Sequence, residues 1–193
     1  MSIVPVILAS SSPRRKELLQ GLKLNFQTHP SDEDETVAPG TAPEEFVEIL
    51  SLRKASSVAA RYDQGLVIGS DTVVVCDGEI LGKPQDEQDA YRMLDMLQGR
   101  AHWVYTGVAI VEAGGNKQQV AHQKTEVFMK PLDESRIRSY IRSGEPMDKA
   151  GSYGIQGLGA TLVEKIHGDF FTVVGLPVSL LSDMLEEFGV HVL

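Results

Sequence analysis

This sequence has one cysteine and no long apolar run. Cys76 is the single cysteine among 193 residues, so no intramolecular disulfide can form, and its place in the apolar run 73–76 predicts an inert core residue. No segment approaches the roughly 20 apolar residues of a membrane-spanning helix, and no signal-peptide pattern is present. These absences predict a protein of the reducing cytoplasm that has no membrane partner.

Positive charge is also scarce. Lys and Arg number 18 against 27 Asp and Glu, which gives a formal net charge of −9. Nucleic-acid binding requires a basic stripe, so no nucleic-acid partner is expected. A small phosphate ligand held by a local group of cations is still compatible with this balance.

Several ligand-binding motifs are missing as well. The five histidines are scattered and show no paired zinc-ligand spacing. The chain has no Walker A sequence and no G-x-G-x-x-G after an apolar strand. Asp71 has no second aspartate two residues later, which excludes the phospho-aspartate phosphatase signature.

Length and periodicity predict one α/β domain over residues 1–193, with a mixed sheet, flanking helices, and two lobes around a central cleft. The expected strands are 4–9, 66–76, 79–81, 103–111, 120–129, 161–165 and 170–174. The expected helices are 13–20, 43–61, 86–97, 133–143 and 177–188. Asp77-Gly78 indicates a hairpin turn.

The segment 10–19 places cations at a helix start. Ser12 is a favoured N-cap and Pro13 is tolerated at the first helical position. Arg14 and Arg15 follow in the first turn, where the helix dipole favours anions instead. A phosphate bound at this helix end would remove the conflict. A solvated basic turn explains the segment equally well.

Asp71 lies within the apolar strand 66–76. A buried, unpaired carboxylate is expensive, so this side chain needs a partner or a function. The alternative is a structural, hydrogen-bonded aspartate at a bulge that Gly69 would permit. We favour the functional interpretation.

Further charges have two interpretations each. The acidic run 32–35 is typical of a solvated face, but its carboxylates also suit Mg²⁺. Arg53, Lys54 and Lys83 are ordinary surface cations individually, and together with the two arginines above they could converge on a polyphosphate. The glycine-rich segment 148–157 is either an irregular connector or a backbone that approaches a ligand closely, with the Gln156 amide as donor and acceptor.

Taken in order, these segments resemble the Maf family of nucleoside triphosphate pyrophosphatases over nearly the whole chain. The matching pieces are 8–15 with Glu17-Leu18-Leu19, Gly69-Ser70-Asp71-Thr72, 78–84, Leu97-Gln98-Gly99, Tyr105-Thr106-Gly107, 145–157 and Val174-Gly175-Leu176-Pro177. The resemblance implies a twisted mixed sheet like that of inosine triphosphatases, and a homodimer.

The resemblance also implies an activity and its residues. The reaction is hydrolysis between the α- and β-phosphates of a nucleoside triphosphate, with Mg²⁺ or Mn²⁺ as cofactor. Asp71 would activate water, and Glu35, or Glu33 in a shifted register, would join it at the metal. Lys54 and Lys83 would complete the catalytic set. The substrate would be bound by Ser10, Ser12, Arg14, Arg15, Thr72 and Gln156.

Three positions resemble the subtype that acts on dTTP and UTP: Arg14, Thr72 and Gln156. The 7-methyl-GTP subtype would show tryptophan and glutamine in place of the first two. Thymine and uracil present acceptor, donor and acceptor groups along one edge, and the Gln156 amide can pair with two neighbours. Such an enzyme would clear unwanted nucleotides, with a link to cell-division arrest. The alternatives are a non-catalytic nucleotide-binding regulator and an inosine-type triphosphatase.

Overall fold

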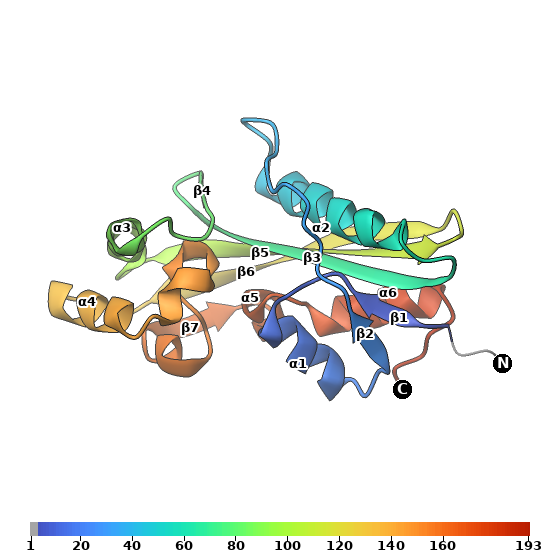
Figure 1. The fold of residues 1–193 in the computed structure, drawn as a ribbon. Coiled ribbons are helices and arrows are strands. Elements are labelled where there is room, and N and C mark those ends of the chain that lie inside the picture. The colour runs from blue at the N-terminus through green and yellow to red at the C-terminus, as the bar shows by residue number, and fades with distance from the viewer. Residues whose placement is uncertain (1–3) are drawn as a thin grey trace. The chain divides into compact units, whose positions relative to one another are not determined.

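The computed structural model describes residues 4–193 and has an α/β fold built on a mixed sheet (Figure 1). Its strands follow the order β2-β1-β3-β5-β6-β7, and β4 pairs with β3. β1 is parallel to β2 and β3, whereas the β3–β4 and β6–β7 pairs are antiparallel. The predicted α/β class with mixed strand directions is therefore confirmed.

The strands are β1 (Val6–Leu8), β2 (Phe26–Thr28), β3 (Gly65–Cys76), β4 (Glu79–Leu81), β5 (Ala101–Ala113), β6 (Gln118–Met129) and β7 (Val163–His167). The α-helices are α1 (Pro13–Gly21), α2 (Pro43–Ala59), α3 (Glu87–Leu97), α4 (Glu134–Arg142), α5 (Phe170–Val174) and α6 (Val178–Glu187). Three short 3-10 helices are η1 (Glu145–Asp148), η2 (Ala150–Ser152) and η3 (Gly157–Thr161). Among residues 4–193, the helices all fall short of the length and apolar content needed to cross a bilayer.

The chain divides into two units. Unit 1 comprises residues 4–71, Thr106–Gln123 and Gly175–Leu193, and unit 2 comprises Thr72–Tyr105 and Lys124–Val174. β3, β5 and β6 each contribute residues to both units. The cleft expected between two lobes stays a prediction.

Unit 1 buries both faces of β1. Side chains alternate along a strand, so Val6 and Leu8 share one face while Ile7 and Ala9 share the other. The first pair belongs to the apolar cluster that includes Leu19 of α1 and residues of α6. The second pair belongs to the cluster formed with α2. Figure 1 accordingly shows α2 on one side of β1 and β3, with α1 and α6 on the other.

Two glycines let α2 approach the sheet of unit 1. A Cβ atom at Gly69 on β3 would lie 2.2 Å from the Ser51 carbonyl oxygen. A Cβ atom at Gly107 on β5 would lie 2.3 Å from the Val47 carbonyl oxygen. Neither position has room for a side chain. Gly69 therefore serves helix packing, and this close approach sets α2 beside Asp71.

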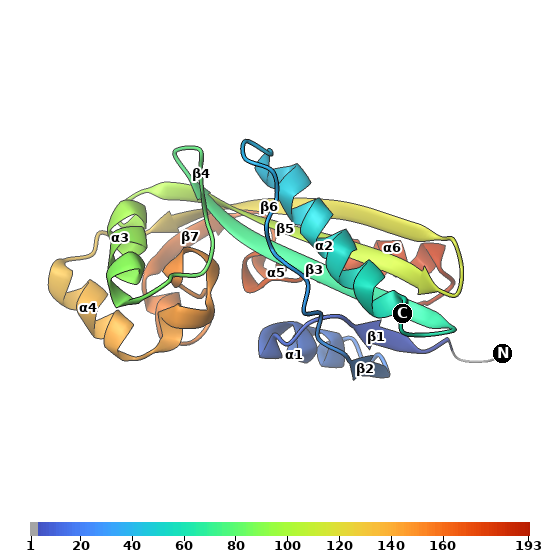
Figure 2. The same ribbon diagram turned by 45° about the horizontal axis from the view of Figure 1, so that its top comes forward.

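Unit 2 has its own apolar core between the strand segments and α3 and α4. Its buried members include Val74, Cys76, Leu94, Ile137 and Ile141. Figure 2 shows α3 and α4 side by side, in agreement with their contacts. The buried position of Cys76 is as expected, and the predicted hairpin turn is formed by Asp77 and Gly78 with φ angles of 50° and 80°.

Three expectations about elements need correction. The residues predicted as a strand at 170–174 form α5, because the Asp169 carboxylate caps this segment by accepting from the Thr172 N–H at 2.5 Å and its hydroxyl at 2.8 Å. The β-branched residues suggested a strand, but this cap favours a helix. The strand predicted at 161–165 is β7, two residues later. β2 was not predicted, since three residues carry too little alternation to detect.

Candidate active site

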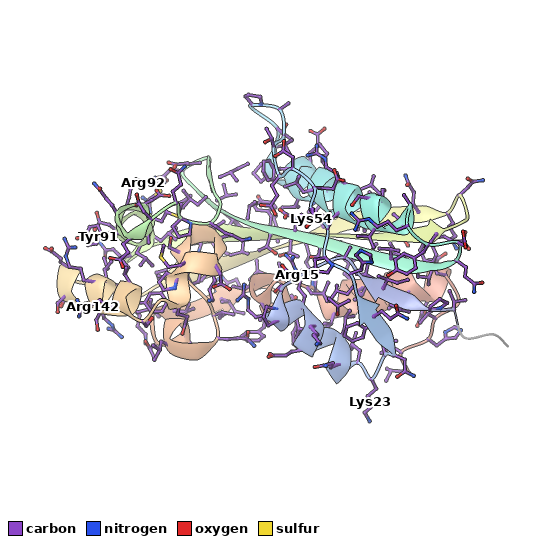
Figure 3. The ribbon with its side chains drawn as sticks, in the orientation of Figure 1. Arg15, Lys23, Lys54, Tyr91, Arg92 and Arg142 are labelled. Carbon is purple, nitrogen blue, oxygen red and sulfur yellow. The ribbon has the colours of Figure 1, made fainter. Side chains whose placement is uncertain are left out.

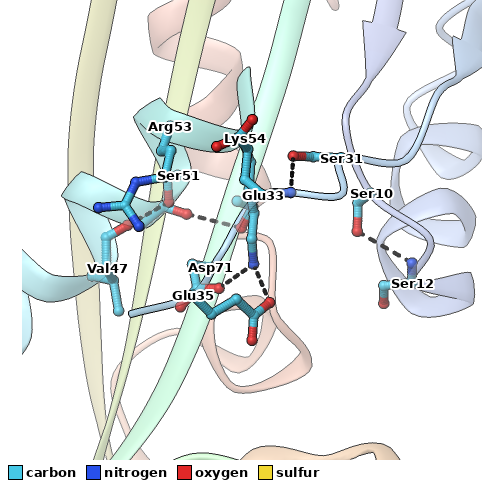
Figure 4. A network of polar contacts seen from close by, with 12 residues as sticks. Ser10, Ser12, Ser31, Glu33, Glu35, Val47, Ser51, Arg53, Lys54 and Asp71 are labelled. Atoms are coloured by element: carbon cyan, nitrogen blue, oxygen red, sulfur yellow. Dashed lines mark hydrogen bonds and ion pairs between the residues drawn. The ribbon is translucent and has the colours of Figure 1, made fainter. Parts of the chain in front are cut away.

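A lysine in unit 1 bridges two carboxylates from distant parts of the sequence. Figure 3 marks Lys54 on α2 and Arg15 on α1. The Lys54 Nζ atom lies 2.6 Å from Asp71 Oδ1 and 2.7 Å from Glu35 Oε1 (Figure 4). Three residues that the sequence indicated as catalytic, from a loop, a helix and a strand, thus meet at one point.

The Asp71 carboxylate is buried, and burial changes its acid strength. The residue is 8% exposed on β3. Burial raises the pKa of Asp71, while the charges of Lys54 and Arg15 and the hydrogen bond from Lys54 oppose that rise. Asp71 is therefore a paired carboxylate of increased basicity, which is the property expected of a proton acceptor.

Arg53 holds the loop that carries Glu35. Its guanidinium donates from one nitrogen to the carbonyl oxygens of Asp34 at 2.6 Å and Thr36 at 2.9 Å, one on each side of Glu35. The sequence left Arg53 open as a surface cation or as one of several cations around a polyphosphate, and in the structure its guanidinium is engaged with these backbone oxygens. Sequence reasoning missed this loop-holding contact, because no local pattern reveals a pair of carbonyl partners 17 and 19 residues away.

The acidic run separates into different environments. Glu35 contacts Lys54, whereas the Glu33 backbone N–H donates to Ser31 Oγ at 3.3 Å (Figure 4). The Asp34 carboxylate accepts from the Thr36 hydroxyl and N–H, and these bonds lower the pKa of Asp34. Geometry therefore favours Glu35 over Glu33 as the partner of Asp71.

The start of α1 is built as the sequence predicted. The Ser12 side chain caps the helix by accepting from the Arg15 N–H at 3.5 Å, and Pro13 is the first helical residue. Ser10 Oγ accepts from the Ser12 N–H at 3.2 Å and from the Arg15 guanidinium at 3.3 Å. Three of the expected substrate-binding residues of this segment are thus linked to one another, and Arg14 stands beside them at the second helical position.

Arg15 also donates to a carbonyl group that the sequence did not identify. Its Nε atom lies 2.7 Å from the Gly175 oxygen, which also accepts from Ser70 Oγ at 3.1 Å. Partial burial lowers the pKa of Arg15, and the charge of Asp71 works in the opposite direction. The sequence did offer one signal for this carbonyl group, because segment 174–177 is one of the pieces that carry the family resemblance.

Three expected site residues belong to unit 2. Thr72 is half-buried and follows Asp71 on β3, and Gln156 is exposed directly before η3. Lys83 is exposed after β4 and lines a pocket of this unit with Gln85, Asp89 and Arg92, the last marked in Figure 3. That these residues join Asp71 around one ligand stays a prediction.

Comparison with known proteins places the chain in a family. The sequence matches the Maf-like protein family over residues 5–188. The dTTP/UTP pyrophosphatase of Pelotomaculum thermopropionicum is 52% identical over 188 residues, covering 97% of this chain and 98% of the relative. The protein of the same name from Moorella thermoacetica is 50% identical over 187 residues, covering 97% and 96%.

Solved structures share the fold at much lower identity. The Staphylococcus aureus Ham1 protein has a TM-score of 0.53 at 13% identity, covering 95% of this chain and 99% of its own. A HAM1 protein from Coxiella burnetii has a TM-score of 0.51 at 16% identity, covering 83% and 81%. These likenesses concern the fold alone. The near-complete sequence matches confirm the family that the motifs indicated, and the chain belongs to the Maf-like proteins.

Proposed function

We propose that this protein hydrolyses dTTP and UTP to the nucleoside monophosphate and pyrophosphate. The observation that carries the proposal is the buried Asp71 carboxylate held by Lys54 beside Glu35. The comparisons support the proposal as well. Relatives that are 46–52% identical to this chain over nearly their full length carry the name dTTP/UTP pyrophosphatase. The role would be removal of unwanted pyrimidine triphosphates, with a link to cell-division arrest.

In this proposal Asp71 takes the proton of the attacking water. The water oxygen forms a bond to phosphorus as the α–β anhydride bond breaks, and pyrophosphate leaves with the bond's electron pair. Burial raises the pKa of Asp71, which makes it a stronger base than a solvent-exposed aspartate. Lys54 keeps the carboxylate oriented at 2.6 Å and stabilises its charge until the proton arrives.

The site suits a hard divalent cation. The Lys54 ammonium already stands between two carboxylate groups, so Glu35 and Asp71 are placed to face a common positive charge. Magnesium takes one or two carboxylates together with substrate phosphates, and manganese favours the same oxygen ligands. Because the chain supplies two carboxylates here, substrate oxygens would complete the coordination. The bound ion would polarise the phosphoryl oxygens and neutralise charge on the leaving group.

The remaining residues bind the substrate in this proposal. Arg14, Arg15 and Lys83 would stabilise the negative charge of the triphosphate, with Ser10 and Ser12 at its edge. Thr72 and Gln156 would contact the pyrimidine base. A family match that runs through both units, over residues 5–188, supports their action as one domain. We also propose a cytoplasmic homodimer, to be checked by light scattering and cell fractionation.

Product analysis with a panel of triphosphates tests the function. The wild-type protein should release pyrophosphate from dTTP and UTP in the presence of Mg²⁺ and should lose this activity with a chelator. Asp71→Asn should reduce kcat by roughly 10²–10⁴-fold, the span expected for a general base. Asp63→Asn, at a residue outside the cluster, is the matched control.

The outcomes separate the alternatives. Binding of dTTP without any pyrophosphate release would identify a nucleotide-binding regulator. Preference for ITP or XTP over dTTP would identify an inosine-type triphosphatase. Preference for 7-methyl-GTP would overturn the subtype. Release of inorganic phosphate in place of pyrophosphate would contradict cleavage of the α–β bond.

A further inference from the structure

The loop that carries Gln156 is fixed on both sides by two side chains of unit 2. Glu145 Oε2 accepts from the Leu158 N–H at 2.9 Å, and its Oε1 accepts from the Gly159 N–H at 2.9 Å. Tyr140 donates its hydroxyl to Glu145 Oε1 at 2.8 Å and accepts from the Gly154 N–H at 3.2 Å. These contacts hold the backbone at residue 154, before Gln156, and at residues 158–159, after it.

This pair of side chains is suited to a permanent structural role. Burial acts to raise the pKa of Glu145, but the donors from Gly159, Leu158 and Tyr140 outweigh it and lower that pKa. Burial raises the pKa of Tyr140, so its hydroxyl keeps its proton and can donate to the carboxylate. The Glu145 carboxylate is therefore charged at neutral pH. Hydrogen bonds to a charged acceptor are stronger than those between neutral groups.

The glycines of the loop fit around this pair. A Cβ atom at Gly157, where φ is 64°, would lie 2.7 Å from Glu145 Oε2. A Cβ atom at Gly159 would lie 2.6 Å from the Tyr140 hydroxyl oxygen. For the glycine-rich segment 148–157 the sequence left two interpretations open, an irregular connector or a backbone that approaches a ligand. The structure shows that Gly157 approaches the chain's own Glu145, and that Gly159, just beyond this segment, approaches Tyr140.

We propose that Tyr140 and Glu145 are positioning residues that set the base selectivity of the enzyme through Gln156. The inference rests on the proposed function, in which the Gln156 amide pairs with the uracil or thymine edge. A loop held in advance spends no binding energy on ordering itself. It also keeps the Gln156 amide at a position where the polar groups of the correct base find hydrogen-bond partners and those of a mismatched base do not. Neither side chain touches the reacting phosphates in this scheme.

Selectivity between UTP and CTP measures the proposed effect. The two substrates share the ribose and triphosphate and differ at the base edge, where uracil offers N3–H and O4 and cytosine offers N3 and an amino group. Tyr140→Phe and Glu145→Gln should each reduce the UTP-to-CTP ratio of kcat/KM roughly tenfold, mainly through a higher KM for UTP. Glu134→Gln makes the same chemical change in an exposed ion pair of α4 and should leave the ratio unchanged.

A double variant distinguishes positioning from general destabilisation. If Tyr140 acts through Gln156, then Tyr140→Phe should reduce selectivity no further in a Gln156→Ala background. Thermal unfolding of each variant checks that the fold persists. Equal losses for UTP and CTP, or additive losses in the double variant, would overturn the inference.

Binding measurements keep this test separate from that of the function. Calorimetry with a chelator present gives the UTP-to-CTP affinity ratio without turnover, because the proposed hydrolysis requires Mg²⁺. A wild-type protein that binds UTP selectively but releases no pyrophosphate would overturn the proposed function alone. Its Tyr140→Phe variant should still lose the binding preference, and an unchanged preference would overturn the positioning role.

Discussion

Lowering the pH should destabilise unit 2 through His102, a buried histidine on β5. The residue is 2% exposed, and its Nε2 atom lies 2.7 Å from the Tyr153 hydroxyl oxygen. The other ring nitrogen, Nδ1, is buried and has no hydrogen-bond partner within residues 4–193. A proton added to the ring would leave an N–H group without an acceptor and a buried charge beside Arg100. Burial, with a smaller contribution from Arg100, accordingly lowers the pKa of His102 from 6.5 to about 4.

The sign of the effect follows from proton uptake. Between the folded pKa of about 4 and the unfolded value of 6.5, the unfolded chain binds the proton and the folded chain does not. The free energy of unfolding therefore rises with pH across this window, and the stabilisation is lost as pH falls below about 6.5. With these two pKa values, the loss is about 2 kcal/mol between about pH 7.5 and about pH 5, and about 3 kcal/mol when both states are protonated.

Urea unfolding followed by tryptophan fluorescence measures this loss directly. Trp103, the single tryptophan, adjoins His102 on β5 and reports on the same unit. His102→Gln keeps a polar group opposite Tyr153 but cannot gain a proton, so its unfolding free energy should fall about 2 kcal/mol less over the same pH range. His191→Gln alters an exposed histidine and should retain the wild-type slope. Equal slopes for wild type and His102→Gln would refute the reasoning.

Three further predictions follow from unit 1. Lys54→Met removes the cation that opposes the effect of burial on the Asp71 pKa, so the acidic limb of the kcat–pH profile should move to higher pH; an unmoved limb would contradict the pairing. Arg53→Gln releases the loop around Glu35 and should raise the half-saturating Mg²⁺ concentration roughly tenfold, measured by titration and by calorimetry. Gly69→Ala should lower the unfolding free energy by about 1–3 kcal/mol or more through overpacking, whereas Gly21→Ala, which meets no atom within 4 Å, should leave thermal unfolding nearly unchanged.

Local signals in the sequence predicted several elements whose determinants are local. The Ser12 and Asp133 caps each act within three residues of the N–H groups that they bind. The Asp77-Gly78 turn depends on two adjacent residues that adopt positive φ angles. Asp71 was also identifiable, because a charged residue in an apolar strand is conspicuous whatever its partner.

Partners that are distant in the chain leave no such signal. Arg15 Nε reaches the Gly175 oxygen 160 residues away, and a backbone carbonyl has no identity in the sequence.

The wrong prediction of a strand at α5 has a different cause. There the β-branched residues of 170–174 gave a strand signal, and one side chain decided in favour of a helix. Propensity is a weak guide when a specific hydrogen bond acts against it.

The geometry of β3 and α2 explains why Asp71 and Lys54 occur in these particular contexts. Gly69 and Asp71 are two residues apart on a strand, so both point to the same face. Ser51, Lys54 and Ala55 are three and four residues apart on a helix, so they also share a face. The bare backbone at Gly69 receives the turn of α2 that includes Ser51 and Ala55, and this brings the Lys54 ammonium to the neighbouring carboxylate. The close approach is what makes a buried aspartate tolerable, because the helix that packs at Gly69 also supplies the cation that pairs with Asp71.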